Sequence, residues 1–253
     1  MLEIYRFIKD DFSLLDRKAV FALVYAAFGL AGIYYLKDKD SFAAFSRVTG
    51  FEGFGNFVGR SEINNLPGLA YWVLVVTIFY FVIPTFAIKF FFKTDLKDHG
   101  LRFKIEKGFW KLYLLCTAVM LPIVYLMSLT SGFAAKYPFF KVYNGDPYLS
   151  PAFFAWELIY FLQFFGLEFF FRGFLVHSLK PSLGLYSIFA MTVPYCMIHF
   201  GKPMPETFAA IAAGIFLGWL SYRNGSIWLG LLLHCTVAFS MDIMSLYNKG
   251  LLF

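Results

Sequence analysis

The sequence predicts an all-α protein, a polytopic integral membrane helical bundle with about seven transmembrane segments and eight as the upper count. Three observations predict this class. Of the 253 residues, 60% are hydrophobic and 15% are charged, whereas soluble domains hold roughly 45–50% apolar and about 25% charged residues. The mean hydropathy is +0.66. The apolar residues also fall into segments close to the ~20 residues that a helix needs to cross a bilayer.

Seven apolar segments make up the predicted bundle. Pro84 lies inside the second and predicts a kink, and Pro151 begins the fourth, where proline suits the first turn of a helix. In the sixth, Ala210, Gly214 and Gly218 recur every four residues, a pattern that lets another helix approach closely. The segments run from about Ala19 to Leu36, Leu69 to Phe92, Trp110 to Leu129, Pro151 to Leu179, Leu185 to Phe200, Glu206 to Tyr222 and Ile227 to Leu246.

The lengths of the connections divide the chain into two predicted regions. In the second half, the turns "KPSLG", "GKPMPE" and "RNGS" are short, which predicts antiparallel neighbours. We expect residues 1–150 to form an N-terminal membrane region with three transmembrane helices, and residues 151–253 to form a separate helical core.

The basic residues predict how the chain lies in the bilayer. The net charge is +6, and Lys and Arg gather in the N-terminal lead-in and between the second and third segments. Because such segments stay in the cytosol and contact anionic headgroups, we expect a cytosolic N-terminus and a lipid partner. Nucleic acid is not an expected partner, since no phosphate loop or zinc-knuckle spacing is present. The three cysteines lie in apolar runs and predict a buried, reduced set.

Ionisable residues are concentrated in the second half of the chain. Such residues inside a membrane segment are functional candidates by default, because burying a charge in lipid is costly. Counted from the turn between the fourth and fifth segments, Glu168 and His199 both lie ~21–25 Å deep. Counted from the next turn, His234 lies ~15 Å and Asp242 ~27 Å deep. The residues concerned are Glu157, Glu168, Arg172, His177, His199, His234 and Asp242.

A carboxylate with two histidines is enough to activate water. The carboxylate of Glu168 can take a proton, and the imidazoles of His199 and His234 can orient the water or donate to a developing oxyanion. Several alternatives stay open. Glu168 and Arg172, four residues apart, can form a structural ion pair. The same three residues can bind zinc or another divalent metal, and the two histidines can bind haem.

Three short motifs carry a resemblance to a known family. They are "LEFFFRG" from Leu167, "YCMIH" ending at His199, and "HCTVA" beginning at His234. In this order they resemble the CPBP family of intramembrane proteases, also called the Abi or CAAX prenyl protease family. That family carries Glu-Glu-x-x-x-Arg, then aromatic-x-x-x-His, then His-x-x-x-Asn or Asp. The chain departs from the pattern at Leu167, where the family has its first glutamate, and at Ala238, where it has Asn or Asp.

The resemblance implies an intramembrane endopeptidase that cleaves a membrane-anchored protein or peptide. In that reading Glu168 is the base, His199 positions the water and His234 stabilises the oxyanion. Arg172 and Asp242 support them, with Asp242 in place of the missing residue at Ala238. Members are described both as metal-free and as metal-dependent hydrolases. The alternative is a catalytically degenerate member that acts as a binding, maturation or immunity factor, with a membrane protein as its partner.

Overall fold

The computed structural model describes residues 11–37, 39–50, 53, 66–104, 107–140 and 151–252. These residues form helices and turns, and the described ranges contain no β-strand, only an isolated bridge between Leu101 and Ser226. The all-α prediction is therefore confirmed. The basic residues Arg6 and Lys9 of the lead-in, and the predicted region boundary at residue 150, lie outside the described residues.

The helices of the structure match the predicted segments. Within the described ranges, six are long and apolar enough to cross a membrane, namely Arg17–Leu36, Gly68–Phe92, Phe109–Ser128, Pro151–Leu183, Met204–Asn224 and Trp228–Asn248. The fifth predicted segment forms a shorter helix, α11 (Tyr186–Met197), followed by a turn. With α11 the segments number seven, as predicted, and the chain is an integral multi-pass membrane protein.

These segments contain the following labelled elements. The first is α2 (Arg17–Leu36), which is followed by α3 (Lys39–Thr49). The second joins α5 (Leu66–Thr77), η1 (Ile78–Val82), α6 (Ile83–Phe86) and η2 (Ala87–Phe92), and η3 (Leu96–His99) follows it. Next come α7 (Phe109–Ser128) and α8 (Ser131–Lys136). The fourth joins α9 (Pro151–Glu168), η4 (Phe169–Leu175) and α10 (Val176–Leu183), and α11, α12 (Met204–Asn224) and α13 (Trp228–Asn248) complete the chain.

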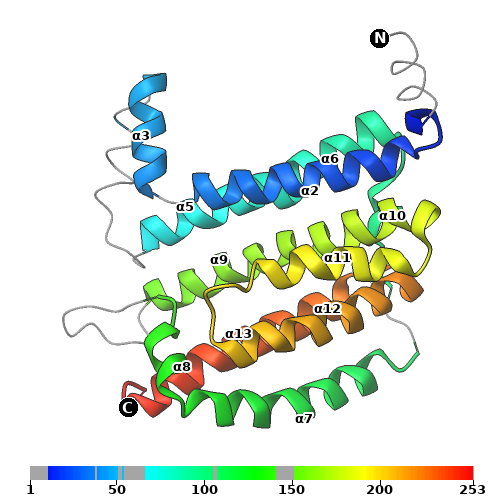
Figure 1. The fold of residues 1–253 in the computed structure, drawn as a ribbon. Coiled ribbons are helices and arrows are strands. Elements are labelled where there is room, and N and C mark those ends of the chain that lie inside the picture. Colours follow the sequence, from blue (N-terminus) through cyan, green and yellow to red (C-terminus); the bar gives the residue numbers. More distant parts are fainter. Residues whose placement is uncertain are drawn as a thin grey trace.

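The long helices run side by side along one axis (Figure 1). The pair α2 and α5–α6 covers one side of the bundle, α7 covers the opposite side against α13, and α9–α10, α11, α12 and α13 lie between them. Helices from both predicted regions therefore pack against one another. The helix α3 stands apart at one end.

Polar contacts hold the two ends of the bundle. One end holds Asp16, Ser182, Gly100 and Ile227, and we call it the basic end. There the hydroxyl of Ser182 donates to Asp16 at 2.7 Å. There the amide of Ile227 also donates to the carbonyl of Gly100 at 3.0 Å. The carboxylate of Asp16 also caps α2 by accepting from the amides of its first turn. The opposite end holds Tyr137 and Glu206, and we call it the far end. There the hydroxyl of Tyr137 donates to Glu206 at 3.0 Å. These contacts fix the depth of each helix relative to its neighbours.

The small residues of α12 let α11 pack closely against it, as the sequence predicts. A Cβ atom added at Gly214 would lie 3.0 Å from Thr192 and 3.1 Å from Tyr195. One added at Gly218 would lie 2.7 Å from Met191. Only glycine permits this separation, so α11 and its Tyr195 are held close to the middle of the bundle.

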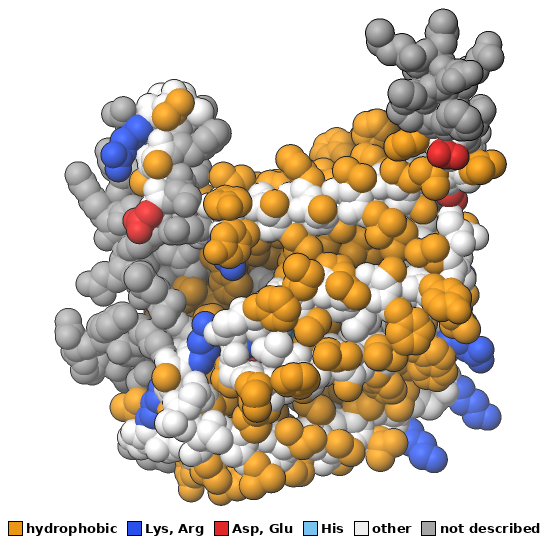
Figure 2. Space-filling view, in the orientation of Figure 1, with side chains coloured by type: hydrophobic (Ala, Val, Ile, Leu, Met, Phe, Trp, Pro, Cys, Tyr) orange, Lys and Arg blue, Asp and Glu red, His pale blue; other side chains and the backbone are white. Residues whose placement is uncertain are grey.

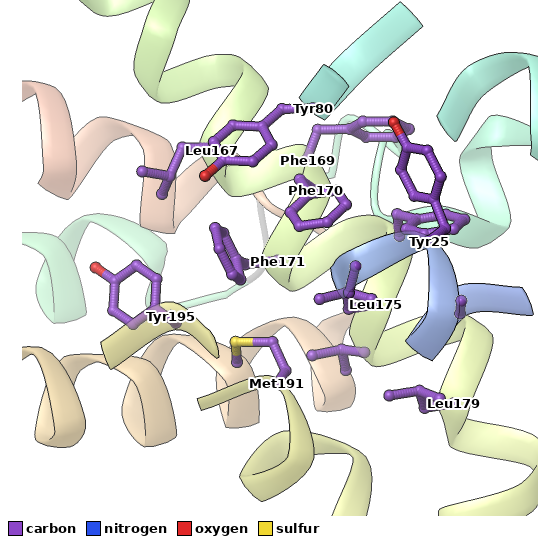
Figure 3. Close-up of a cluster of buried hydrophobic side chains, with 14 of the residues drawn as sticks. Tyr25, Tyr80, Leu167, Phe169, Phe170, Phe171, Leu175, Leu179, Met191 and Tyr195 are labelled. Carbon is purple, nitrogen blue, oxygen red and sulfur yellow. The ribbon is translucent and has the colours of Figure 1, made fainter. Parts of the chain in front are cut away.

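An aromatic cluster forms the main core behind η4 (Figure 3). The ring of Tyr80 stacks on Phe170 with centroids 4.7 Å apart, and Phe171 meets the edge of Tyr195 at 5.3 Å. Aromatic pairs at these separations add to the gain from apolar burial. The cluster fixes the helix that carries the charged residues.

The outside of the bundle is apolar. Hydrophobic side chains cover most of the face shown in Figure 2, and Lys and Arg lie towards its edges. On α7, for example, Leu114, Val119 and Leu126 are more than half exposed. This distribution is the one expected of helices that face lipid.

Candidate active site

Glu168 and Arg172 lie in the interior of the bundle, at the junction of α9 with η4. Both side chains are completely buried, and Nη1 of Arg172 is 3.2 Å from Oε1 of Glu168. The predicted intrahelical ion pair is therefore present. The guanidinium also stacks on the ring of Tyr195, 3.8 Å from its centroid. Two opposite charges and an aromatic face thus offset the cost of burying each charge.

The π-helical turn η4 begins directly after Glu168 and leaves a backbone group to be satisfied from outside. The hydroxyl of Ser221 on α12 donates to the carbonyl of Arg172 at 3.0 Å. The ring of His177 is in turn 3.1 Å from the same hydroxyl. These contacts fix the position of Arg172 and give His177 a structural role.

His234 on α13 is bonded directly to Glu168. Its Nδ1 lies 2.7 Å from Oε1 of the carboxylate. Because a carboxylate only accepts, Nδ1 carries a proton in this hydrogen bond, and in the neutral imidazole Nε2 keeps its lone pair. The hydroxyl of Tyr195 is 3.4 Å from Nε2, and the ring of Phe164 stacks on the imidazole at 4.9 Å. The imidazole is therefore fixed in both orientation and tautomer.

His199 lies beside Tyr195 in the turn that follows α11. Its Nδ1 is 2.8 Å from the backbone carbonyl of Tyr195, and the two rings meet edge to face at 4.8 Å. A carbonyl oxygen only accepts, so Nδ1 again carries the proton and Nε2 keeps a lone pair. Tyr195 thus contacts Arg172, His199 and His234. The sequence assigned it no role, although it is the aromatic residue of the quoted "YCMIH" motif.

Asp242 lies at a different level of the bundle from His234. It follows His234 by two turns of α13, ~12 Å along the helix axis. The side chain is completely buried. Its Oδ2 accepts from Nε1 of Trp156 at 3.3 Å, and it also interacts with the buried carboxyl of Glu157. The structure therefore places Asp242 with α9 side chains nearer the far end. At the motif position, Ala238 is buried.

A large apolar cavity of about 1480 Å³ reaches the two histidines from the far end. His199, His234 and Tyr195 line it, together with Leu167 and Ala238. Glu168 and Arg172 line a separate cavity of about 210 Å³, towards the basic end. The Glu168–His234 hydrogen bond thus joins two cavities, with the imidazole on the large one and the carboxylate on the small one.

The residues of the site do not form a complete ligand set for a catalytic zinc ion, which generally has three protein ligands. Among the described residues, no three His, Cys, Asp or Glu side chains are grouped to hold a metal ion. The atoms left for a metal are Nε2 of His199, Nε2 of His234 and Oε2 of Glu168, but the two histidines line the large cavity and Glu168 lines the small one. The guanidinium of Arg172 already neutralises Glu168.

Comparison with known families gives a match over part of the chain. Residues 149–240 match the family model described as type II CAAX prenyl endopeptidase Rce1-like. No curated protein and no solved structure matches the chain. The matched range covers all three motifs and the helices that carry Glu168, His199 and His234. The resemblance to the CAAX prenyl protease family that the motifs indicate is therefore confirmed for residues 149–240.

Proposed function

We propose that this protein is an intramembrane endopeptidase that hydrolyses a peptide bond of a membrane-associated protein. The observation that carries the proposal is the hydrogen bond between Glu168 and His234. It holds an imidazole lone pair towards a cavity large enough for a peptide segment. The matched family, whose name describes prenyl endopeptidases, supports the same reaction class.

The geometry supports His234 as the general base. Its Nε2 takes a proton from a water molecule, and the oxygen attacks the carbonyl carbon of the scissile bond. The Glu168 carboxylate accepts from Nδ1 and stabilises the imidazolium that forms. His234 then returns the proton to the leaving amine, so that water and a peptide bond yield a carboxylic acid and an amine. This is the role of the carboxylate–histidine pair in other hydrolases.

Tyr195 and His199 complete the proposed machinery. Once His234 is protonated, its Nε2 can no longer accept a hydrogen bond. The Tyr195 hydroxyl is then free to donate to the oxyanion. His199, with a lone pair on Nε2, accepts from the attacking water and positions it. These roles differ from those expected from the sequence, in which Glu168 was the base and His234 stabilised the oxyanion. The reason is that Oε1 of Glu168 is bonded to His234, and that His234 lines the large cavity whereas Glu168 lines the small one.

Hydrolysis by the purified protein tests the proposal. The full chain is reconstituted in liposomes with a fluorogenic peptide that ends in a farnesylated CAAX sequence, and with the same peptide lacking the lipid. We expect cleavage of at least one of them by the wild type and loss of more than 100-fold in kcat in His234→Ala. Leu158→Ala is the matched control, because Leu158 is 70% exposed on the outside of α9. Full activity of His234→Ala contradicts the assignment.

A non-catalytic binding, maturation or immunity factor is the second candidate. The observation that favours it is that Leu167 and Ala238, which replace polar residues of the family pattern, both line the large cavity. A protein of this kind would hold a membrane partner in that cavity without cleaving it. If His234→Ala and Glu168→Ala keep the full cellular phenotype and the wild type cleaves neither peptide, this candidate replaces the protease.

A further inference from the structure

We propose that the small cavity is a water inlet, through which the water consumed in hydrolysis reaches the site separately from the peptide. This inference rests on the proposed function and concerns the supply of its second reactant. The cavity lies at the basic end, between the beginning of α7 and the junction of α12 with α13. Its volume of about 210 Å³ holds several water molecules.

Polar side chains line the inlet from its outer to its inner end, beside apolar ones such as Leu220 and Leu229. Lys107 is exposed on the outer side, and Asn224 and Ser226 are half-buried behind it. Glu168 and Arg172 line the inner end and are completely buried. These polar groups stabilise water, and they make up a larger share of the lining than in the large cavity, which is bordered mainly by apolar side chains.

Charged atoms at the inner end of the inlet lack hydrogen-bond partners that water can provide. Oε2 of Glu168, and Nε and Nη2 of Arg172, have no hydrogen-bond partner among the described residues. A buried charged group left without partners is strongly unfavourable, and ordered water is the usual way in which proteins satisfy one. An acceptor beside two donors provides the mixed set of partners that a water molecule needs. An anion would face repulsion from Oε2.

Gly230 lets the carboxylate of Glu168 lie directly against α13 at the inner end of the inlet. A Cβ atom at this position on α13 would lie 2.7 Å from Oε2 of Glu168. The absence of a side chain at Gly230 therefore provides the space that the carboxylate occupies at the wall of the inlet. Leu112 and Leu217 line both cavities, so they form the partition between them. Water that passes these two side chains enters the cavity that His234 lines.

Cysteine labelling tests the inlet without any measurement of hydrolysis. In a full-length variant without Cys116, Cys196 and Cys235, we compare Leu229→Cys, which lines the inlet, with Leu231→Cys, which lines neither cavity. The probe is the charged reagent 2-sulfonatoethyl methanethiosulfonate, applied to protein in nanodiscs. We expect Leu229→Cys to react at least 10-fold faster, although Leu229 is the more buried of the two. A rate no faster than that of Leu231→Cys overturns the inlet.

Obstruction of the inlet tests its role in the reaction. Leu220→Trp adds volume inside it, with Leu158→Trp on the lipid-facing side of α9 as control. We expect Leu220→Trp to slow labelling of Leu229→Cys and to lower kcat at least 10-fold with KM within twofold. Leu220→Phe is the second variant, in case Leu220→Trp does not fold. Unchanged kcat with slowed labelling overturns the inlet as the water path. If the wild type cleaves no peptide, the proposed function fails, and the labelling ratio still decides whether water occupies the cavity.

Discussion

Nδ1 of His234 lies 2.7 Å from Oε1 of Glu168, across the interface between α13 and α9. The two residues are 66 positions apart in the chain, and the hydrogen bond joins the first motif to the third. In this arrangement the carboxylate sets the tautomer of the imidazole, and the imidazole presents its other nitrogen to the large cavity. Within the candidate site, the imidazole of His234 therefore lines the large cavity, and the carboxylate of Glu168 lines the small one.

Glu168→Gln is expected to lower kcat by roughly 10²–10⁴-fold, and also to lose part of the stability lost in Glu168→Ala, because Arg172 keeps a neutral hydrogen-bond acceptor but no counter-charge. The glutamine amide can donate to Nδ1 of His234, which moves the ring proton to Nε2 and removes the lone pair that acts as base. The measurement is the kinetics of peptide cleavage in liposomes, together with a thermal unfolding curve for each variant. If Glu168→Gln cleaves at the wild-type rate, the carboxylate does not set the tautomer.

The ion pair predicts a separate effect on stability. Glu168→Ala leaves Arg172 buried without its counter-charge, and we expect a loss of about 3–5 kcal/mol in the free energy of unfolding. The double variant Glu168→Leu, Arg172→Met removes both charges and is expected to recover most of that loss while remaining inactive. Unfolding in mixed detergent measures both. Equal stability of Glu168→Ala and the wild type contradicts a structural role for the pair.

Leu167→Glu is expected to raise the rate of cleavage about 10-fold or more. Leu167 lines the large cavity together with His199 and His234, so a carboxylate there faces the water that the histidines bind. Leu167→Gln is the matched control, because it has a similar size and no charge. A gain in both variants means that polarity alone is responsible. A gain in neither indicates that the single carboxylate is sufficient.

Depth along the helices could be predicted from the sequence, but the direction in which each side chain points could not. Helical rise fixes how far a residue lies from a turn, and on this basis Glu168 and His199 were placed at one level. Neighbouring residues on a helix differ by ~100° in direction. Whether Leu167 or Glu168 faces the large cavity is therefore decided by how α9 packs on its neighbours, and here the aromatic cluster around Phe170 and Tyr80 decides it.

Two further features had no usable signal in the sequence. The π-helical turn after Glu168 lies in a run of phenylalanines without proline, and Gly166 before it does not by itself distinguish a π-helical turn from an α-helix. It depends on a tertiary contact, the hydrogen bond from Ser221. The hydrogen-bond partner of Asp242 could not be predicted either, because Trp156 belongs to another helix. Motif spacing indicated only that Asp242 lies on the helix that carries His234.

The stability of the protein is expected to fall as the pH drops from about 6.5 to 4. His99, in the connection before α7, is buried, and this burial lowers the pKa of its imidazole to about 4, with Lys18 adding a smaller effect and Asp98 opposing it. Between the unfolded and folded pKa values only the unfolded chain binds the proton, so stability is full above pH 6.5 and lost as the pH falls. We expect a loss of about 3 kcal/mol at pH 4.

His99→Gln checks that assignment. The glutamine side chain can keep the hydrogen bond that the imidazole forms with Thr94 at 3.1 Å, and it does not titrate. Unfolding curves between pH 4 and 7.5 are therefore expected to be flatter for His99→Gln than for the wild type. The same slope in both proteins means that another group is responsible.

The glycines of α12 allow packing and chemistry to be separated. A methyl group at Gly214 meets the ring of Tyr195 at 3.1 Å, whereas one at Gly218 meets the flexible end of Met191 at 2.7 Å. We expect both Gly214→Ala and Gly218→Ala to lose about 1–3 kcal/mol of stability through overpacking. Only Gly214→Ala moves Tyr195, whose hydroxyl is 3.4 Å from Nε2 of His234. Its kcat is therefore expected to fall several-fold further than that of Gly218→Ala at matched stability. Equal kcat values at matched stability indicate that Tyr195 contributes only to packing.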